Sequence, residues 1–215
     1  MYFAIEGVIG VGKTTLARQL QPSFDADLQL EVFEENPFLS DFYSDRARYA
    51  FQTQIFFLLS RYQQQRRNIP QLLAEGHSVI SDYTFEKDSL FASINIQGDE
   101  LEMYYRVHEA LAEKIPAPDL IVYLRASTDV LMQRIASRDR PYERQMERNY
   151  IHTLNLAYDD FFKSQWATPV LTIETDHLNY VQRPEDLHQV EDLIRHALQN
   201  PPLQPLLPLT SEGQV

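Results

Sequence analysis

The sequence contains no cysteine and no long apolar run. Without cysteine, its 215 residues cannot form a disulfide framework, a thiolate metal site or a cysteine nucleophile. Since no stretch of about eighteen apolar residues occurs, we expect no membrane-spanning helix and no membrane partner. The chain starts without a basic and then apolar leader, so we also expect no signal peptide. The absence of cysteine fits a cytoplasmic location, which we expect.

Positive charge is scarce as well. The 19 lysine and arginine residues are outnumbered by 31 aspartates and glutamates, which gives a formal net charge of −12. Such a charge repels the phosphates of nucleic acids, and we therefore expect no nucleic-acid partner. Any smaller ligand that carries phosphate has to be held by local cations. The length and the 44% hydrophobic content fit one domain with a sizeable core.

Glycine is rare, and half of it lies in one short stretch. Three of the six glycines fall within residues 7–14, which fit the pattern G-x-x-x-x-G-K-[ST] of a phosphate-binding loop. An apolar run at 2–5 precedes the loop and leucines at helical spacing follow it. Glycines let backbone N–H groups approach phosphate oxygens, the lysine contacts phosphate, and the threonine hydroxyl can bind Mg²⁺. The alternative is a glycine turn that binds nothing. We predict a nucleoside triphosphate site with Mg²⁺ at Gly7, Gly10, Val11, Gly12, Lys13, Thr14 and Thr15.

Apolar, β-prone runs alternate with longer helical stretches along the chain. The predicted strands lie near 2–6, 28–34, 77–82, 118–124 and 168–174, and the predicted helices near 13–20, 47–66, 69–75, 87–113, 127–138, 145–164 and 184–198. This alternation predicts an α/β fold of the P-loop NTPase type, with a five-stranded parallel sheet between two helix layers. In such sheets ligands bind at the carboxyl ends of the strands.

The end of the chain is rich in proline. Four prolines lie between residues 201 and 208, and each removes a backbone N–H donor from helix or sheet. We therefore predict a P-loop domain at 1–199 and an extended or disordered tail at 200–215.

Carboxylates follow the second and third predicted strands. Glu31, Glu34 and Glu35 come within five residues of one another, and phosphoryl transfer to an alcohol needs a carboxylate near the hydroxyl to take its proton. A solvated acidic turn is the alternative. Asp82 ends the third strand, where a carboxylate can hold Mg²⁺ opposite Thr14, although an Asp that caps the next helix is the alternative.

Three arginines gather near the end of one predicted helix. Arg134, Arg138 and Arg140 lie within seven residues in an otherwise acidic chain. Arginines can stabilise a phosphoryl group as charge spreads over its oxygens, and a mobile segment that carries them can exclude water. We predict an arginine-rich lid; favourable charge at a helix C-terminus explains only one or two of the three.

From residue 2 to roughly 198 the chain resembles the deoxyribonucleoside kinase family, especially its bacterial deoxyadenosine/deoxyguanosine kinase branch. The resemblance implies transfer of the ATP γ-phosphate to the 5′-hydroxyl of a purine deoxynucleoside in nucleotide salvage, and a homodimer packed through long helices such as 47–66 and 87–113. It implies Lys13, Glu31, Arg138 and Arg140 as catalytic residues. It implies Glu31, Leu39, Tyr43, Gln54, Arg61, Asp88 and Glu143 as substrate-binding residues, and Arg134 as a phosphate contact.

Within this resemblance, Glu31 takes the 5′-hydroxyl proton, Gln54 bonds the base, and Tyr43 and Glu143 reach the 3′-hydroxyl. Arg61 lies two helical turns beyond Gln54 and therefore faces the same side, where Asp88 is its partner. The family's nucleotide-base loop corresponds to about 175–180.

The chain departs from the family at one position after the third strand. The family often has an arginine after the strand-end carboxylate, whereas this chain has Tyr83. Two alternatives to a deoxynucleoside kinase stay open. A thymidylate kinase-like enzyme shares the loop, sheet and lid, but the acidic end of the second strand suits a neutral nucleoside better. A nucleotide-binding subunit without turnover is supported by Tyr83 and disfavoured by the intact Lys13, Thr14 and Glu31.

Overall fold

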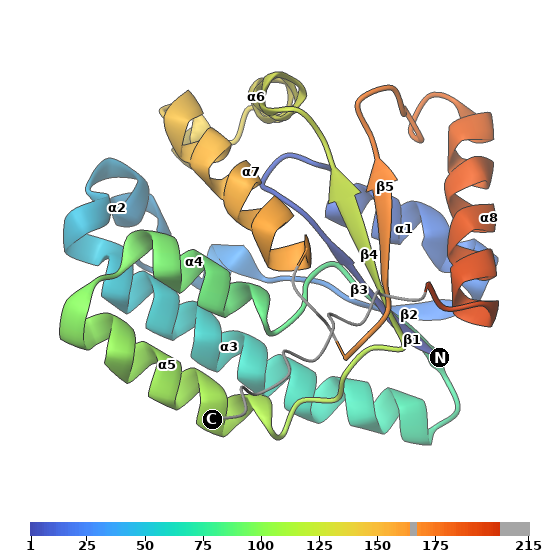
Figure 1. Ribbon diagram of the computed structural model, residues 1–215, viewed down its shortest axis with the longest axis horizontal. Coiled ribbons are helices and arrows are strands. Elements are labelled where there is room, and N and C mark those ends of the chain that lie inside the picture. The colour runs from blue at the N-terminus through green and yellow to red at the C-terminus, as the bar shows by residue number, and fades with distance from the viewer. Residues whose placement is uncertain (164–166, 203–215) are drawn as a thin grey trace, which may run out of the picture.

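Five parallel strands form the centre of the molecule, as the alternating pattern predicts. The computed structural model describes residues 1–163 and 167–202, except for the side chain of Glu34. The strands are β1 (Tyr2–Glu6), β2 (Ala26–Gln29), β3 (Ser78–Ser81), β4 (Leu120–Arg125) and β5 (Val170–Glu174), in the spatial order β2-β3-β1-β4-β5 (Figure 1). The predicted fold class is confirmed, while most of the predicted tail at 200–215 lies outside the described residues.

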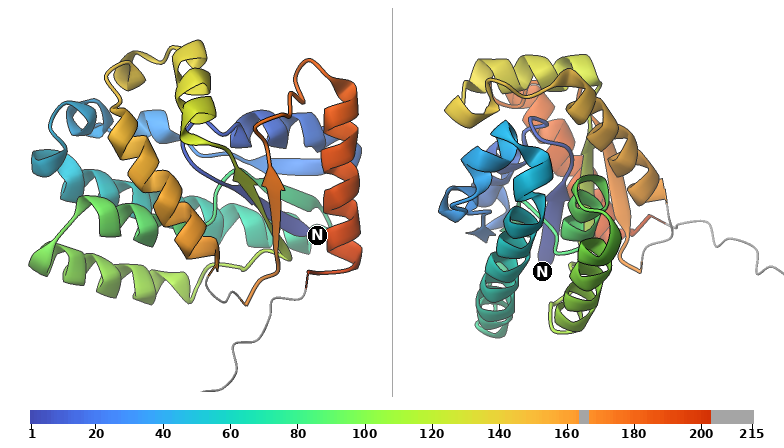
Figure 2. Two further views of the ribbon diagram at one scale, coloured as in Figure 1. Left: turned by 45° about the horizontal axis from the view of Figure 1, so that its top comes forward. Right: turned by 90° about the vertical axis from the view of Figure 1, so that its left-hand side faces the viewer.

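Helices cover both faces of this sheet (Figures 1 and 2). Helices α1 and α8 pack on one face, and α3, α4 and α7 lie on the other. The helices are α1 (Lys13–Phe24), α2 (Leu39–Ser44), α3 (Arg46–Ala74), α4 (Lys87–Asn95), α5 (Gly98–Ala112), α6 (Thr128–Arg138), α7 (Arg148–Lys163) and α8 (Pro184–Gln199), with 3₁₀ turns at Phe33–Glu35 and Pro141–Glu143. None of the described helices combines the length and apolar character that crossing a membrane requires.

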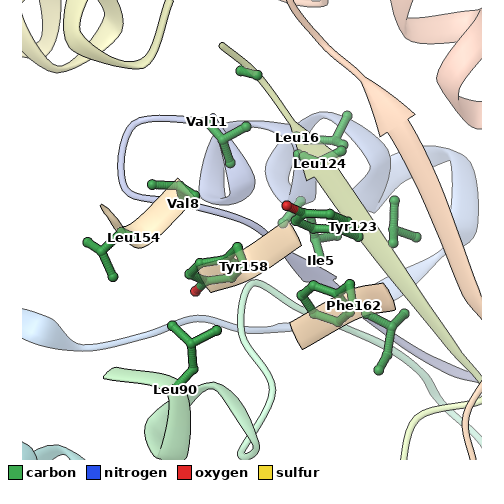
Figure 3. Close-up of a cluster of buried hydrophobic side chains, with 14 of the residues drawn as sticks. Ile5, Val8, Val11, Leu16, Leu90, Tyr123, Leu124, Leu154, Tyr158 and Phe162 are labelled. Atoms are coloured by element: carbon green, nitrogen blue, oxygen red, sulfur yellow. The ribbon is translucent and has the colours of Figure 1, made fainter. Parts of the chain in front are cut away.

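Strand β4, which lies beside the central strand β1, is buried on both faces, and this explains its unbroken apolar sequence. On one side the ring of Tyr123 stacks on that of Phe162 in α7, with 4.4 Å between centroids. Figure 3 shows Tyr158 of the same helix beside them, close to Ile5 of β1. This packing fixes α7 against the two central strands, and with it the segment that leads from α6 over the carboxyl ends of the strands.

The second strand is earlier and shorter than the predicted 28–34. It pairs residue by residue with β3, from Ala26 beside Ser78 to Gln29 beside Ser81. Because β3 ends at Ser81, the chain beyond Gln29 has no neighbouring strand to bond. The chain therefore leaves the sheet after Gln29, and residues from Glu31 onward follow the edge at which the strands end.

Two helical predictions also need correction. The predicted helices 47–66 and 69–75 are one continuous helix, α3, despite Pro70 inside it. Ile69 is fully buried against Tyr2 and Val79 of the sheet, and this packing compensates for the backbone bond that proline removes. Conversely, the predicted helix 87–113 is divided between α4 and α5.

Candidate active site

A cavity of about 380 Å³ lies at the carboxyl ends of the strands. It is bordered by the glycine-rich loop after β1, the segments after β2 and β3, helices α2 and α3, and the turn after α6. A cavity of this size is sufficient for a small organic ligand. The predicted site residues that line it are Gly10, Gly12, Lys13, Thr14, Thr15, Glu31, Leu39, Tyr43, Gln54, Arg61, Asp82, Arg138, Arg140 and Glu143.

Two glycines of the loop occupy positions that a side chain cannot share. Gly7 has φ 147°, and a Cβ there would meet the Leu124 carbonyl oxygen of β4 at 2.5 Å. Gly12 has φ 107°, and a Cβ there would clash with the Tyr180 hydroxyl, which donates to the Val11 carbonyl oxygen at 3.2 Å. The glycines thus let the loop turn closely over β4 and under the 175–180 segment.

The Lys13 side chain folds back over this loop. Its Nζ donates to the carbonyl oxygens of Gly7 at 2.6 Å and Val8 at 3.3 Å. Burial, followed by repulsion from the Lys87 ammonium, lowers the pKa of Lys13 to about 8. The charge of Lys13 therefore lies in an unfavourable environment that a bound anion would improve.

A buried carboxylate anchors the start of the loop. Glu6 is fully buried at the end of β1. One of its oxygens accepts from the Gly7 N–H at 3.1 Å, and the other accepts from the Thr84 N–H at 2.6 Å and the Thr84 hydroxyl at 3.1 Å. Tyr158 of α7 donates to it as well, at 3.3 Å. Glu6 thereby joins the ends of two strands and α7, a role that the sequence motif does not reveal.

Asp82 joins the loop to the segment after β2. One carboxylate oxygen accepts from the Thr14 hydroxyl, and the other accepts from the Glu31 backbone N–H at 2.8 Å. The predicted metal pair, Thr14 and Asp82, is therefore in contact. Its hydroxyl and carboxylate oxygens suit Mg²⁺, which usually takes one or two carboxylates and completes its shell with phosphate and water. In the described part of the chain, no group of three or more His, Cys, Asp or Glu residues is arranged to hold a metal by protein ligands alone.

Glu31 extends into the cavity between two cations. Its Oε1 accepts from Arg61, and its Oε2 accepts from Lys87 Nζ at 2.7 Å. Burial by itself raises the pKa of Glu31, but the charges and hydrogen bonds of Arg61 and Lys87 hold that pKa well below its usual range. Glu35, by contrast, is exposed, and the side chain of Glu34 lies outside what the structure describes. Glu31 is thus the described carboxylate of this segment that faces the cavity.

Arg61 connects Glu31 to Asp88, which does not itself line the cavity. Its other terminal nitrogen pairs with Asp88, which is fully buried at the start of α4. Gln54 lies on the same face of α3 and also lines the cavity, as the helical spacing predicts. At the far wall, the Tyr43 ring stacks on Tyr142 with 5.9 Å between centroids.

The turn after α6 brings two arginines to the cavity, held by one carboxylate. Arg138 donates to the carboxylate of Glu143, with a shortest distance of 2.6 Å, and Arg140 lies 3.5 Å from it. Glu143 is only 4% exposed, and Arg140 also lies over the Phe33 ring. The predicted lid arginines are therefore paired with Glu143, the residue predicted to contact the sugar.

Arg134 has a different position from the other two arginines. It is not among the residues that line the cavity. Its guanidinium donates to the Val11 carbonyl oxygen at 3.1 Å, the Thr175 hydroxyl at 3.0 Å and the Thr175 carbonyl oxygen at 2.6 Å. Arg134 thus ties the phosphate-binding loop to the segment after β5, and its predicted contact with phosphate stays a prediction.

Comparison with known proteins extends over almost the whole chain. The family model for deoxynucleoside kinase matches residues 3–199. Deoxyguanosine kinase from Bacillus subtilis is 36% identical over 201 residues, which are 92% of this chain and 97% of that protein. The chain belongs to the deoxynucleoside kinase family. It is accordingly an ATP-dependent kinase that acts on deoxynucleosides.

Two further relatives of the kinase agree with this result. The deoxyadenosine/deoxycytidine kinase of Bacillus subtilis is 26% identical over 202 residues, covering 90% of this kinase and 91% of the relative. A solved structure of deoxyadenosine kinase from M. mycoides with bound dCTP has a TM-score of 0.78 at 25% identity, covering 91% of this kinase and 99% of that chain. The similarity thus includes the sheet and the helices that surround the cavity.

Lys87 and Tyr142 are among the cavity residues of this kinase that sequence reasoning missed. Lys87 had a detectable signal, because it precedes Asp88 and is one of only four lysines in an acidic chain. Tyr142 had none beyond its place between Arg140 and Glu143, since its stacking on Tyr43 joins segments about a hundred residues apart.

The low pKa of Glu31 makes the stability of the kinase depend on pH. A folded-state pKa below the unfolded value of about 4.3 gives stabilisation that is present above that value and lost as pH falls toward the folded pKa. Glu31→Gln removes this contribution and leaves Lys87 buried without its partner. We expect the variant to be less stable than wild type by about 3 kcal/mol at pH 7, and the difference to shrink below about pH 4.3.

Urea unfolding of both proteins, from pH 7 down to the lowest pH at which both unfold cooperatively, measures this difference. Glu35→Gln is the matched control, because the same chemical change at an exposed position should cost little at any pH. A difference between wild type and Glu31→Gln that stays constant with pH would contradict the depressed pKa.

Proposed function

We propose that the kinase transfers the γ-phosphate of ATP to the 5′-hydroxyl of purine deoxynucleosides, deoxyguanosine and/or deoxyadenosine, in nucleotide salvage. One observation carries this proposal. A single cavity joins a phosphate-binding loop at one end to Glu31, Gln54 and Arg61 at the other. Deoxyguanosine kinase from Bacillus subtilis, 36% identical over 92% of the chain, supports the purine preference.

At the donor end, residues 7–15 bind the phosphates of ATP. The N–H groups at the start of α1 and the Lys13 ammonium face this end, and both favour an anion. Thr14 and Asp82 would hold Mg²⁺, which, when bound, neutralises charge on the phosphates. Arg134 supports the loop from the side, through its bonds to Val11 and Thr175.

At the acceptor end, the nucleoside lies along α3. Gln54, together with Arg61 and its partner Asp88, offers donors and acceptors to the edge of the base. Leu39 and the Tyr43 ring supply apolar contact, and Tyr43 and Glu143 reach the 3′-hydroxyl. In this proposal the 5′-hydroxyl lies at Glu31, between the base and the phosphates.

The reaction requires the lid to change partners. Arg138 and Arg140 leave Glu143 for the phosphoryl group when ATP and nucleoside are both bound, and Glu143 becomes free for the sugar. The closed lid excludes water, which otherwise competes with the nucleoside as acceptor. In a loose transition state the arginines stabilise charge on the phosphoryl oxygens.

Monophosphate formation tests the proposal directly. Wild-type enzyme with ATP and Mg²⁺ is given deoxyguanosine, deoxyadenosine, deoxycytidine, thymidine or thymidine monophosphate. We expect turnover of one or both purine deoxynucleosides and little turnover of thymidine. Turnover of only thymidine monophosphate would show a nucleotide kinase. A chain that binds ATP and turns over no nucleoside would be a nucleotide-binding subunit.

We also propose that the kinase acts in the cytoplasm as a homodimer packed through α3 and α5. Leu59 of α3 and Met103 and Tyr105 of α5 support this assembly, because these large apolar side chains are exposed on the single chain. Light scattering should give the mass of a dimer for wild type and of a monomer for Leu59→Glu. A monomeric wild type contradicts the proposed assembly.

A further inference from the structure

Lys87 is a buried cation at the junction of the two ends of the cavity. It is the first residue of α4, five positions after Asp82, and its side chain is only 4% exposed. Its Nζ lies 2.7 Å from Glu31 Oε2, and its side chain lines the same cavity as Lys13 and Arg138. Burying an ammonium group is costly, so its place in the site calls for an explanation.

Pairing with Glu31 alone does not account for this lysine. The carboxylate of Glu31 already has Arg61 on its other oxygen, and Lys87 lines the same cavity as the Lys13 ammonium. Two ammonium groups that face one cavity create a positive region suited to an anion between them. On the proposed function, that anion is the phosphoryl group on its way from ATP to the nucleoside.

The residue directly after Asp82 does not supply a group to the cavity: Tyr83 is not among the residues that line it. The Tyr83 hydroxyl donates to Gln64 at 2.9 Å and accepts from Gln29 at 3.3 Å, so it is held within the protein. The Lys87 Nζ lies 5.4 Å from the centre of the Tyr83 ring. A cation is thus present beside Glu31, but it comes from the following helix.

We propose that Lys87 is a catalytic residue that contacts the phosphoryl group during its transfer, a role that rests on the proposed function. The bond between the γ-phosphorus and the β,γ-bridging oxygen of ATP breaks, and the 5′-oxygen forms a bond to that phosphorus. The hydroxyl proton passes to Glu31, and ADP and the deoxynucleoside monophosphate leave. Lys87 stays protonated throughout. As Glu31 takes the proton it loses its negative charge, while charge remains on the phosphate beside it. The Lys87 ammonium then exchanges the carboxylate for the phosphate.

Three substitutions separate charge from packing. Lys87→Gln keeps a hydrogen-bond donor for Glu31, Lys87→Met keeps the length of the side chain, and both remove the charge. Lys87→Arg keeps the charge. We expect kcat to fall by about 10²–10³-fold in the two neutral variants, the KM for ATP to change by less than about threefold, and Lys87→Arg to stay within about tenfold of wild type. Melting temperatures show which variants fold, and Lys114→Met, at an exposed position, should match wild type.

A double-mutant cycle decides whether Lys87 acts directly or only through Glu31. In the Glu31→Gln background, single-turnover rates are measured with and without Lys87→Gln. A direct contact with phosphate predicts a further fall of about 10-fold or more, whereas a lysine that only positions or ionises Glu31 predicts no further fall. No further fall would overturn the proposal.

Different results contradict the role of Lys87 and the proposed function. An active wild type with equally active Lys87→Gln and Lys87→Met variants would overturn the role of Lys87 and leave the kinase activity standing. A wild type that is inactive on every nucleoside would overturn the proposed function itself. If one neutral variant fails to fold, the other carries the test.

Discussion

Replacing Lys13 with alanine should lower kcat by about 10³-fold or more while leaving the fold intact. Phosphoryl transfer depends almost entirely on positioning and electrostatic stabilisation, so the loss of a charge on the transferring group is costly. Lys13 is the lysine of the phosphate-binding loop, and its Nζ contacts only carbonyl oxygens among its described hydrogen bonds. The Lys13 ammonium can therefore bind an anion without first breaking a hydrogen-bonded ion pair among the described contacts.

The fold should tolerate this substitution for the same reason. Burial and repulsion from Lys87 lower the pKa of Lys13 to about 8, which means that the folded protein disfavours its charge. We therefore expect a melting temperature no lower than that of wild type without nucleotide, and a smaller rise on addition of ATP. Lys114→Ala, an exposed lysine, serves as control and should behave as wild type. Turnover near the wild-type rate in Lys13→Ala would overturn the assignment of the loop.

The parts of the site that could be predicted from sequence are those encoded by neighbouring residues. Residues 7–14 carry loop, charge and hydroxyl in one stretch, and their neighbours predict the strand and helix that flank it. Asp82 could be predicted because the carboxyl ends of parallel strands meet at one edge, and the structure indeed brings it to Thr14. For the loop and for Asp82, the local sequence pattern and the sheet topology were sufficient to predict the position.

Other parts depend on contacts between distant segments, which a single sequence does not encode. The end of β2 is set by the end of its partner β3, about fifty residues later. Helix α3 continues through Pro70 because Ile69 packs against the sheet. The contact of Lys87 with Glu31 joins segments 56 residues apart, and the position of Arg134 follows from the loop after β5. In each case tertiary packing overrides or completes the local pattern.

Replacing Glu31 with glutamine should lower kcat by about 10²–10⁴-fold, the usual contribution of a general base. Glu31 is an unusual base, because Arg61 and Lys87 hold its pKa well below the ordinary range. A loose transition state reduces this difficulty, since the acceptor hydroxyl keeps its proton until late in the transfer. Glu31 then acts first by accepting the hydrogen bond that orients the 5′-oxygen, and takes the proton as the new bond forms.

The matched control for Glu31 lies four residues away in the same acidic segment. Glu35 is exposed, so Glu35→Gln should retain kcat within about threefold of wild type, and Glu34→Gln is measured beside it. The comparison uses kcat with saturating ATP and a purine deoxynucleoside, after all three variants are shown to bind ATP. If Glu34→Gln or Glu35→Gln carries the large loss and Glu31→Gln does not, the base has been assigned to the wrong carboxylate. In that case Glu31 is not the base, and its ion pairs with Arg61 and Lys87 serve to position those two residues and to stabilise the fold.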